Sequence, residues 1–107
     1  MLLVVDNKIP VAVCDQHTVV SISVDGQAKL SAFSVDDGSY DNCSDIYYSI
    51  RRMDTYCDPA DTLFTDTITF CCDDINTSQM VELKVTDVLG YYNTCMVSVT
   101  IQEKYHL

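Results

Sequence analysis

Residues 80–87 are Met-Val-Glu-Leu-Lys-Val-Thr-Asp, and apolar and polar side chains alternate along the whole stretch. In a β-strand, every second side chain points to the same face. Val81, Leu83 and Val85 then face a core, and the polar side chains between them face solvent. The stretch therefore predicts an amphipathic β-strand, and the rest of the chain is interpreted outward from it.

The same alternation recurs on both sides of this stretch. It predicts seven short strands, over residues 10–14, 17–24, 27–34, 46–53, 65–72, 80–87 and 94–102. The side chains expected to face the core in five of the other strands are Val20, Ile22, Val24, Ala28, Leu30, Ala32, Ile46, Tyr48, Ile50, Ile68, Phe70, Cys72, Cys95, Val97, Val99 and Ile101. Asp25-Gly26 predicts a tight hairpin turn between the second and third strands. This number and spacing of strands is typical of an all-β, immunoglobulin-like β-sandwich of about seven antiparallel strands.

Length and charge limit the possible functions. The chain has 107 residues, with 16 Asp and Glu against 6 Lys and Arg, and a net charge of −10. Its length fits one domain. Such an acidic chain is repelled by phosphate backbones and anionic lipid, so roles at nucleic acid and at membrane surfaces are disfavoured. No apolar run is long enough for a membrane-spanning helix, which excludes membrane insertion.

Six cysteines in so short a chain indicate either a disulfide framework or a metal cage. They are Cys14, Cys43, Cys57, Cys71, Cys72 and Cys95. Zinc sites use closely spaced C-x₂₋₄-C pairs, and no C-x-x-C occurs here. We therefore expect disulfides and an extracellular or cell-surface location, with fifteen pairings formally open.

Residues 4–8 near the start are similar to residues 100–104 near the end, and both have the pattern of a last strand running into a polar linker. This similarity predicts one unit of a tandem array. Residues 1–9 would end the preceding repeat, residues 10–104 form the domain, and residues 105–107 begin the next linker. An ordinary pairing of terminal strands is the alternative explanation.

Three motifs together resemble the hyalin-repeat (HYR) family. Residues 85–104 (VTDVLGYYNTCMVSVTIQEK) are similar to its closing motif, residues 6–14 (DNKIPVAVC) to its opening, and Asp41-Asn42-Cys43 to the D-N-C of its middle loop. The resemblance covers nearly the whole chain. Similar units occur in large surface and secreted proteins of Bacteroidota-type bacteria and in animal adhesion proteins. The resemblance thus implies a repeat domain of a surface or secreted protein, of the bacterial variety.

The resemblance also implies a disulfide pattern. The family's first-to-last bridge corresponds to Cys14–Cys95, which would join the first strand to the last. A further family cysteine is absent near Gln27, so Cys43 needs another partner. We expect Cys43–Cys72 and Cys57–Cys71 for the remaining pairs.

Acidic side chains cluster in the predicted loops at one end of the sandwich. Calcium takes six to eight oxygen ligands, and a site at the junction with a preceding repeat could supply them. The candidate ligands are Asp6, Asp36, Asp37, Asp41, Asn42 and Asp87. The alternative is that these are simply turn residues. Asp73, Asp74 and Asn76 form a second acidic turn at the opposite end, facing the next repeat. They could complete a site shared between repeats, but a solvated turn is the preferred interpretation.

Five further side chains are candidates for ligand binding: Tyr47, Tyr91, Tyr92, Arg51 and Arg52. Tyrosine offers a rigid amphipathic contact surface for sugar or protein. Either arginine could bind a ligand carboxylate. Arg52, however, falls on the same face of its predicted strand as Ile46, Tyr48 and Ile50. A structural ion pair of a partly buried arginine is therefore the competing interpretation.

Catalysis is not expected, because neither His17 nor His106 lies in a recognisable nucleophile–base pattern. The sequence predicts a non-catalytic extracellular repeat that acts as a stiff spacer, or as an adhesive or assembly unit in a surface protein or filament. Its expected partners are neighbouring repeats of the same chain or other subunits. The alternative is a module that binds a glycan or a cell-surface protein. No cofactor is expected apart from the calcium considered above.

Overall fold

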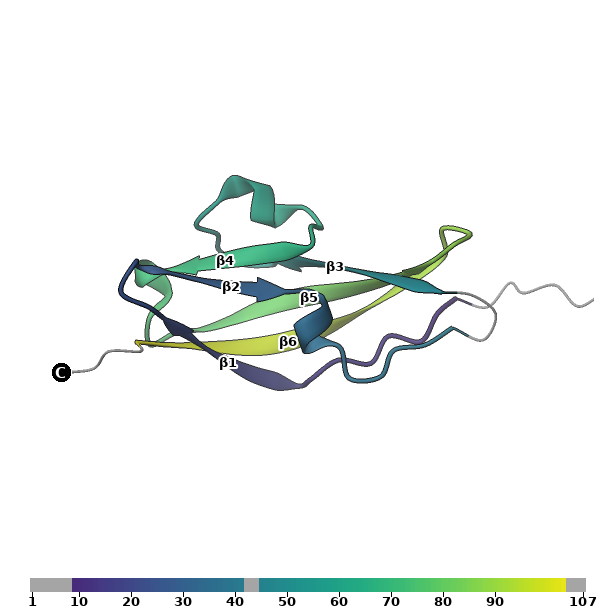
Figure 1. Cartoon of the computed structure of the whole chain (residues 1–107), viewed down its shortest axis with the longest axis horizontal. Helices are drawn as coiled ribbons and strands as arrows, with labels where there is room; N and C mark the ends of the chain where they lie inside the picture. The colour runs from purple at the N-terminus through teal and green to yellow at the C-terminus, as the bar shows by residue number, and fades with distance from the viewer. Residues whose placement is uncertain (1–8, 42–44, 104–107) are drawn as a thin grey trace, which may run out of the picture.

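The protein folds into two β-sheets, as Figure 1 shows. The computed structural model describes residues 9–41 and 45–103, and this part contains no α-helix. The larger sheet has the strand order β1-β6-β5-β3, and the smaller pairs β2 with β4. The strands are β1 (His17–Ile22), β2 (Gln27–Ser31), β3 (Ile46–Arg52), β4 (Thr67–Cys71), β5 (Ser78–Asp87) and β6 (Tyr92–Glu103). Three short 3₁₀ turns are η1 (Phe33–Val35), η2 (Pro59–Thr62) and η3 (Cys72–Asp74). The predicted all-β class is confirmed.

Both sheets contribute to one core. The alternation in β5 buries Val81, Leu83 and Val85 completely, as predicted. The buried apolar side chains come from both sheets and from the segments that follow β2: Ile22, Leu30, Ala32, Val35, Ile50, Ile68, Phe70, Val81, Leu83, Val85, Val97, Val99 and Ile101. Because β-branched side chains fill most of these positions, the pleated surfaces pack closely against each other.

The connection between β1 and β2 differs from the predicted hairpin. β1 pairs with β6 in parallel, whereas β2 pairs with β4 in antiparallel orientation. The turn at Asp25 and Gly26 therefore carries the chain from one sheet to the other. Of these two residues only Gly26 has positive φ, at 79°. Val24, predicted to face the core, is 85% exposed because the chain has left the sheet after Ile22.

Residues 10–14 do not form the predicted strand. They make two isolated bridges to the loop after η1, between Val11 and Tyr40 and between Cys14 and Asp36. Between these bridges the Ser39 hydroxyl bonds both the N–H and the carbonyl of Val13. A side chain thus replaces ladder hydrogen bonds, so a continuous strand does not develop.

Two more strand ends were predicted too long. Residues 32–34 fall at or within η1, and Cys72 begins η3, where its side chain is exposed instead of facing the core. Of the predicted linkers, residues 1–8 and 105–107 lie outside the described residues, as does Lys104.

The alternation in β5 predicts a clear contrast in stability. Leu83→Ala is expected to lower the free energy of unfolding by about 2–5 kcal/mol, because it leaves a cavity between the sheets. Val24→Ala is expected to change it by less than about 0.5 kcal/mol, because the side chain is exposed. Urea denaturation of both variants measures the difference. Equal losses would contradict this assignment of faces.

Candidate functional site

A buried arginine organises one end of the molecule. Arg52 is the last residue of β3, and its inward position follows from the same parity that buries Ile50. Its side chain is almost inaccessible, with 2% of the residue exposed. A buried charge is costly unless it is paired and hydrogen-bonded. The interpretation of Arg52 as a structural ion-pair residue is consistent with this burial.

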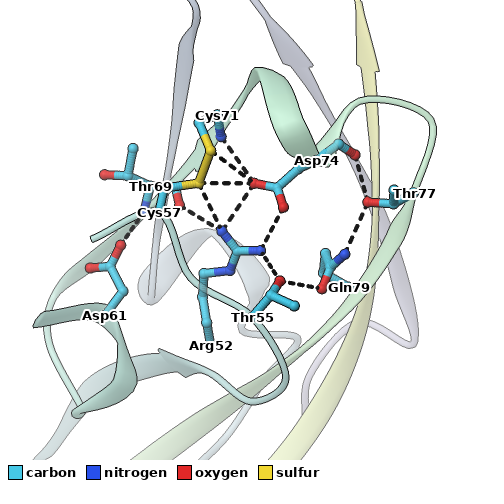
Figure 2. Close-up of polar contacts among 9 residues, drawn as sticks. All are labelled: Arg52, Thr55, Cys57, Asp61, Thr69, Cys71, Asp74, Thr77 and Gln79. Carbon is cyan, nitrogen blue, oxygen red and sulfur yellow. Dashed lines mark hydrogen bonds and ion pairs between the residues drawn. A yellow bond between two sulfur atoms is a disulfide. The ribbon is translucent and has the colours of Figure 1, made fainter. Parts of the chain in front are cut away.

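The partner of Arg52 is Asp74, at the end of η3 (Figure 2). The pair is bidentate, with Nη2 to Oδ1 at 2.8 Å and Nη1 to Oδ2 at 3.0 Å. The short turn η3 holds the carboxylate in place, because Oδ2 also accepts a hydrogen bond from the Cys71 N–H at 3.0 Å. The prediction of a solvated turn is therefore wrong for Asp74, which is 5% exposed, whereas Asp73 is exposed.

The remaining hydrogen bonds of the guanidinium reach the loop after β3 and strand β4. Nη2 donates to the Thr55 hydroxyl at 2.9 Å and Nη1 to the Thr69 carbonyl at 3.1 Å. The Phe70 ring lies under the guanidinium, 4.6 Å from Cζ to its centroid. Thr55 then bonds Gln79, Gln79 bonds Thr77, and Thr77 bonds the Asp74 carbonyl, which closes a ring of polar contacts (Figure 2). Of the three guanidinium nitrogens of Arg52, only Nε has no hydrogen-bond partner among the described residues.

The disulfide Cys57–Cys71 covers this ion pair and confirms one predicted bridge. The Cys57 sulfur lies 3.4 Å from Arg52 Nη1 and 3.2 Å from Asp74 Oδ2. Because a disulfide sulfur carries no hydrogen, these are contacts of a polarisable atom with both charges. The bridge ties the loop after β3 to the end of β4.

Cys57, Cys71 and Asp74 are also close enough to be considered as metal ligands. Their ligand atoms lie within 4.8 Å of one another. Metals bind cysteine as the thiolate, which the disulfide does not offer, and the carboxylate already holds Arg52. The arrangement thus functions as a buried structural cluster in the oxidised protein.

The surroundings of Asp74 determine how it titrates. Burial raises the pKa of this carboxyl, but the hydrogen bonds from Arg52 and from the Cys71 N–H, together with the guanidinium charge, outweigh that effect. The net result is a pKa below the usual 3.8. Asp74 is therefore ionised wherever the fold is normally stable.

The other cysteines confirm one prediction and correct another. Cys14 and Cys95 form a disulfide, with a sequence separation of 81. Cys72 is a free and exposed thiol, so the predicted Cys43–Cys72 bridge is not formed; Cys43 lies outside the described residues. The physical reason lies at Cys72, where the chain turns out of β4 into η3, so that the side chain is exposed and its sulfur lies 3.7 Å from the Gly26 carbonyl oxygen.

The candidate calcium ligands are only partly described, since Asp6 and Asn42 lie outside the described residues. Asp36 accepts hydrogen bonds from Ser39, Gly38 and the Tyr48 hydroxyl. Asp87 faces inward and bonds the N–H groups of Leu89 and Tyr91 through Oδ1, while its Oδ2 is buried without a hydrogen-bond partner.

Asp37 is exposed, and Asp41 lies next to the bridge at Tyr40. The described residues bring no three of these acids within ligand distance of one another. The calcium site stays a prediction.

The predicted ligand-binding residues divide between two environments. Tyr47 and Tyr92 flank Thr86 on the outward face of the larger sheet, and Arg51 lies on the same face, paired with Glu82 at 2.7 Å. Tyr91 is exposed in the turn before β6. Arg52 is buried, so its predicted availability to a ligand is wrong.

Sequence reasoning missed two buried acids. Asp74 carries a weak signal, because an inward arginine needs a carboxylate, but the chain offers many acids. Asp61 is also buried and accepts the Thr69 N–H at 2.9 Å. Asp61 lies in a long loop without alternating apolar and polar residues, so no sequence pattern indicates that its side chain is buried.

Comparison of the chain with protein-family models, with curated proteins and with solved structures finds no match. Among the described residues, no helix is long and apolar enough to cross a membrane. The arguments on function below therefore depend on the chain's own geometry.

Breaking the buried pair is expected to cost far more than breaking the surface pair. Asp74→Ala leaves the Arg52 charge buried and unpaired, and should lower the free energy of unfolding by about 3–5 kcal/mol. Glu82→Ala, which breaks the pair with the partly exposed Arg51, should cost at most about 1 kcal/mol. Urea denaturation at pH 7 measures both. If Asp74→Ala does not fold, adding Arg52→Met should restore folding, because the unpaired charge is then removed; failure of that rescue would contradict the explanation.

The lowered pKa of Asp74 predicts loss of stability in acid. A carboxyl with a lowered folded-state pKa contributes full stability above its unfolded value near 3.8, and loses it as the pH falls through the folded value. The pKa of Asp36 is also lowered. Burial raises it, but the hydrogen bonds from Ser39, Tyr48 and Gly38 together have the larger, opposite effect. Denaturation between pH 7 and pH 2.5 should show a fall that begins near pH 4. The double variant Arg52→Met, Asp74→Asn should show a shallower fall, and an identical profile would exclude Asp74 as a contributor.

Proposed function

We propose that this chain is a non-catalytic, immunoglobulin-like β-sandwich repeat of the HYR kind, which acts as a stiff spacer or assembly unit in an extracellular or cell-surface protein or filament. The observation that carries the proposal is how the first and last segments of the domain are joined. Two disulfides are compatible with an oxidising, extracellular environment.

The non-covalent part of this joint is the parallel pairing of β1 with β6. The register runs from His17 opposite Ser98 to Ile22 opposite Glu103. When the Cys14–Cys95 bridge is absent, tension applied through the chain pulls β1 from its start and β6 from its end. In a parallel pair these points lie at opposite ends, so the hydrogen bonds between the strands are loaded together in shear. Figure 1 shows the two strands side by side along one edge of the larger sheet.

The covalent part is the Cys14–Cys95 bridge. Cys14 precedes β1 and Cys95 lies within β6, opposite Leu83 of β5. Tension that reaches Cys14 passes through the bridge to Cys95 and out along β6. The chain between the two cysteines is bypassed, so it cannot lengthen while the bridge is intact. A module that holds its length under tension suits a spacer in a long surface protein.

The contacts of Arg52 with Asp74, Thr55 and the Cys57–Cys71 bridge support the same function by holding a loop inside the domain in place. The loop between β3 and β4 could open easily, yet it is held by the Cys57–Cys71 bridge and by hydrogen bonds from Arg52 to Thr55 and from Thr69 to Asp61. A tightly held loop is a poor protease substrate. In the proposed function, neighbouring repeats or subunits contact the acidic loops at the two ends.

Single-molecule stretching tests this proposal. Removing the bridge with Cys14→Ser and Cys95→Ser should increase the fully extended length by about 220–240 Å, at about 3.3–3.6 Å per residue step. Of the 81 steps between the two cysteines, the 14 between Cys57 and Cys71 stay closed by the second disulfide. The same variant should lose about 4–5 kcal/mol of unfolding free energy in the chain-entropy model. It should still resist tension through the β1–β6 pair before it lengthens.

A matched control is the variant with Cys57→Ser and Cys71→Ser. This bridge lies inside the bypassed loop, so its removal should leave the extended length of the protein unchanged. Equal lengths for the Cys14, Cys95 variant and the original protein would contradict the spacer proposal. So would a melting temperature that reducing agent does not change.

A further inference from the structure

The solvent-facing side of the larger sheet has a charge unlike that of the rest of the molecule. Cross-strand register places one set of side chains on this side, which we call the outer face. It consists of His17, Val19, Ser21, Tyr47, Ser49, Arg51, Ser78, Met80, Glu82, Lys84, Thr86, Tyr92, Thr94, Met96, Ser98, Thr100 and Gln102. In a chain with 16 acids, Glu82 is the one acidic residue among them. The outer face is therefore poor in acidic residues on a strongly acidic protein, and its single acid is paired with Arg51.

Its charges leave one cation available. Arg51 Nε and Glu82 Oε1 lie 2.7 Å apart and neutralise each other. Lys84 makes no ion pair with any described residue. Its ammonium carries three hydrogen-bond donors, and the aromatic rings beside it cannot satisfy them as a carboxylate would. Lys84 therefore gives the outer face a net positive charge that a ligand anion can approach.

Two aromatic rings lie beside this cation. Lys84 Nζ lies 4.4 Å from the ring centroid of Tyr92 and 5.0 Å from that of Phe64, which reaches over from the loop before β4. Tyr47 and Tyr92 are both opposite Thr86, one on each side of β5. They are 59% and 54% exposed. Two strand spacings separate them, or about 9–10 Å.

These features together select a ligand chemistry. Rings spaced along a flat surface present faces against which sugar rings can stack, and Tyr supplies such contacts at low entropic cost. An ammonium between the rings binds a carboxylate through a charge-assisted hydrogen bond. The Ser and Thr hydroxyls of neighbouring strands add donors and acceptors for sugar hydroxyls. Elsewhere on the molecule, a polyanion would meet the acidic loops and be repelled.

We propose that the outer face, with Lys84 beside Tyr92 and Phe64 and with Tyr47 across β5 from Tyr92, binds a carboxylated polysaccharide. The sugar rings stack on the tyrosines, and a uronic acid carboxylate accepts hydrogen bonds from Lys84. The scarcity of acidic residues on this face explains how so acidic a protein holds an anionic chain. This binding is independent of the spacer function, because no residue of the Cys14–Cys95 bridge takes part in it.

Binding of polygalacturonate to the full chain at low ionic strength, measured by isothermal titration calorimetry, tests the proposal. Fully methyl-esterified polygalacturonate is the matched ligand, because it keeps the sugar backbone and removes the charge. Poly-glutamate is the second comparison, because it keeps the charge without the sugar. The original protein should bind polygalacturonate and bind the other two at least tenfold more weakly.

Variants locate the site. Lys84→Met keeps the aliphatic stem and should weaken binding about tenfold, the loss expected for one charge-assisted hydrogen bond. Tyr92→Leu should weaken binding as well, through loss of stacking. Lys29→Met removes an exposed charge from β2, on the other sheet, and should bind normally. Circular dichroism and melting temperature establish that each variant is folded.

Three results would overturn the proposal. They are no binding of polygalacturonate by the original protein, equal binding of the methyl ester or of poly-glutamate, and equal losses for Lys84→Met and Lys29→Met. Each leaves the stretching experiments unaffected, so this binding site and the spacer function can fail separately.

Discussion

A guanidinium buried at the end of β3 is the constraint around which one end of this protein is built. Arg52 is placed inward by the alternation of its strand, and burial would be prohibitive without a carboxylate held in register with it. Asp74 supplies that carboxylate. Its Oδ2 also accepts a hydrogen bond from the Cys71 N–H, which stabilises the short turn η3. The disulfide Cys57–Cys71 then covers the pair. Loop, turn and bridge thus all contact this one buried ion pair.

The two disulfides join different parts of the domain. Cys57–Cys71 joins a loop to the strand that follows it, whereas Cys14–Cys95 joins the segment before β1 to the last strand. Only the second spans most of the chain, so in the proposed function it carries tension past the domain. The parallel β1–β6 pair lies directly after this bridge and would bear tension in shear once the bridge is removed. The larger sheet therefore carries the proposed mechanical function along one edge, and its outward side remains free for ligand binding.

Prediction from the sequence succeeded where a residue's role depends on its immediate neighbours. The alternation in β5 is enough to place Val81, Leu83 and Val85 in the core, since a strand has only two faces. It failed where the chain changes sheets. Val24 continues the alternation of β1 but is exposed, because the strand has ended and the turn at Gly26 leads to the other sheet. Cys72 continues the alternation of β4 and is exposed for a similar reason, at the start of η3.

By itself, the sequence determined the all-β class, most strand positions and the inward direction of Arg52, because these follow from period-two alternation and the short range of turn chemistry. Tertiary structure alone decided which strands pair, which cysteine stays free and which of many acids neutralises Arg52. Each of these depends on residues far apart in the chain meeting in space. Lys84, for example, is an ordinary polar position of an amphipathic strand until β6 and the Phe64 loop place aromatic rings beside it. Its proposed role in binding exists only in that assembly.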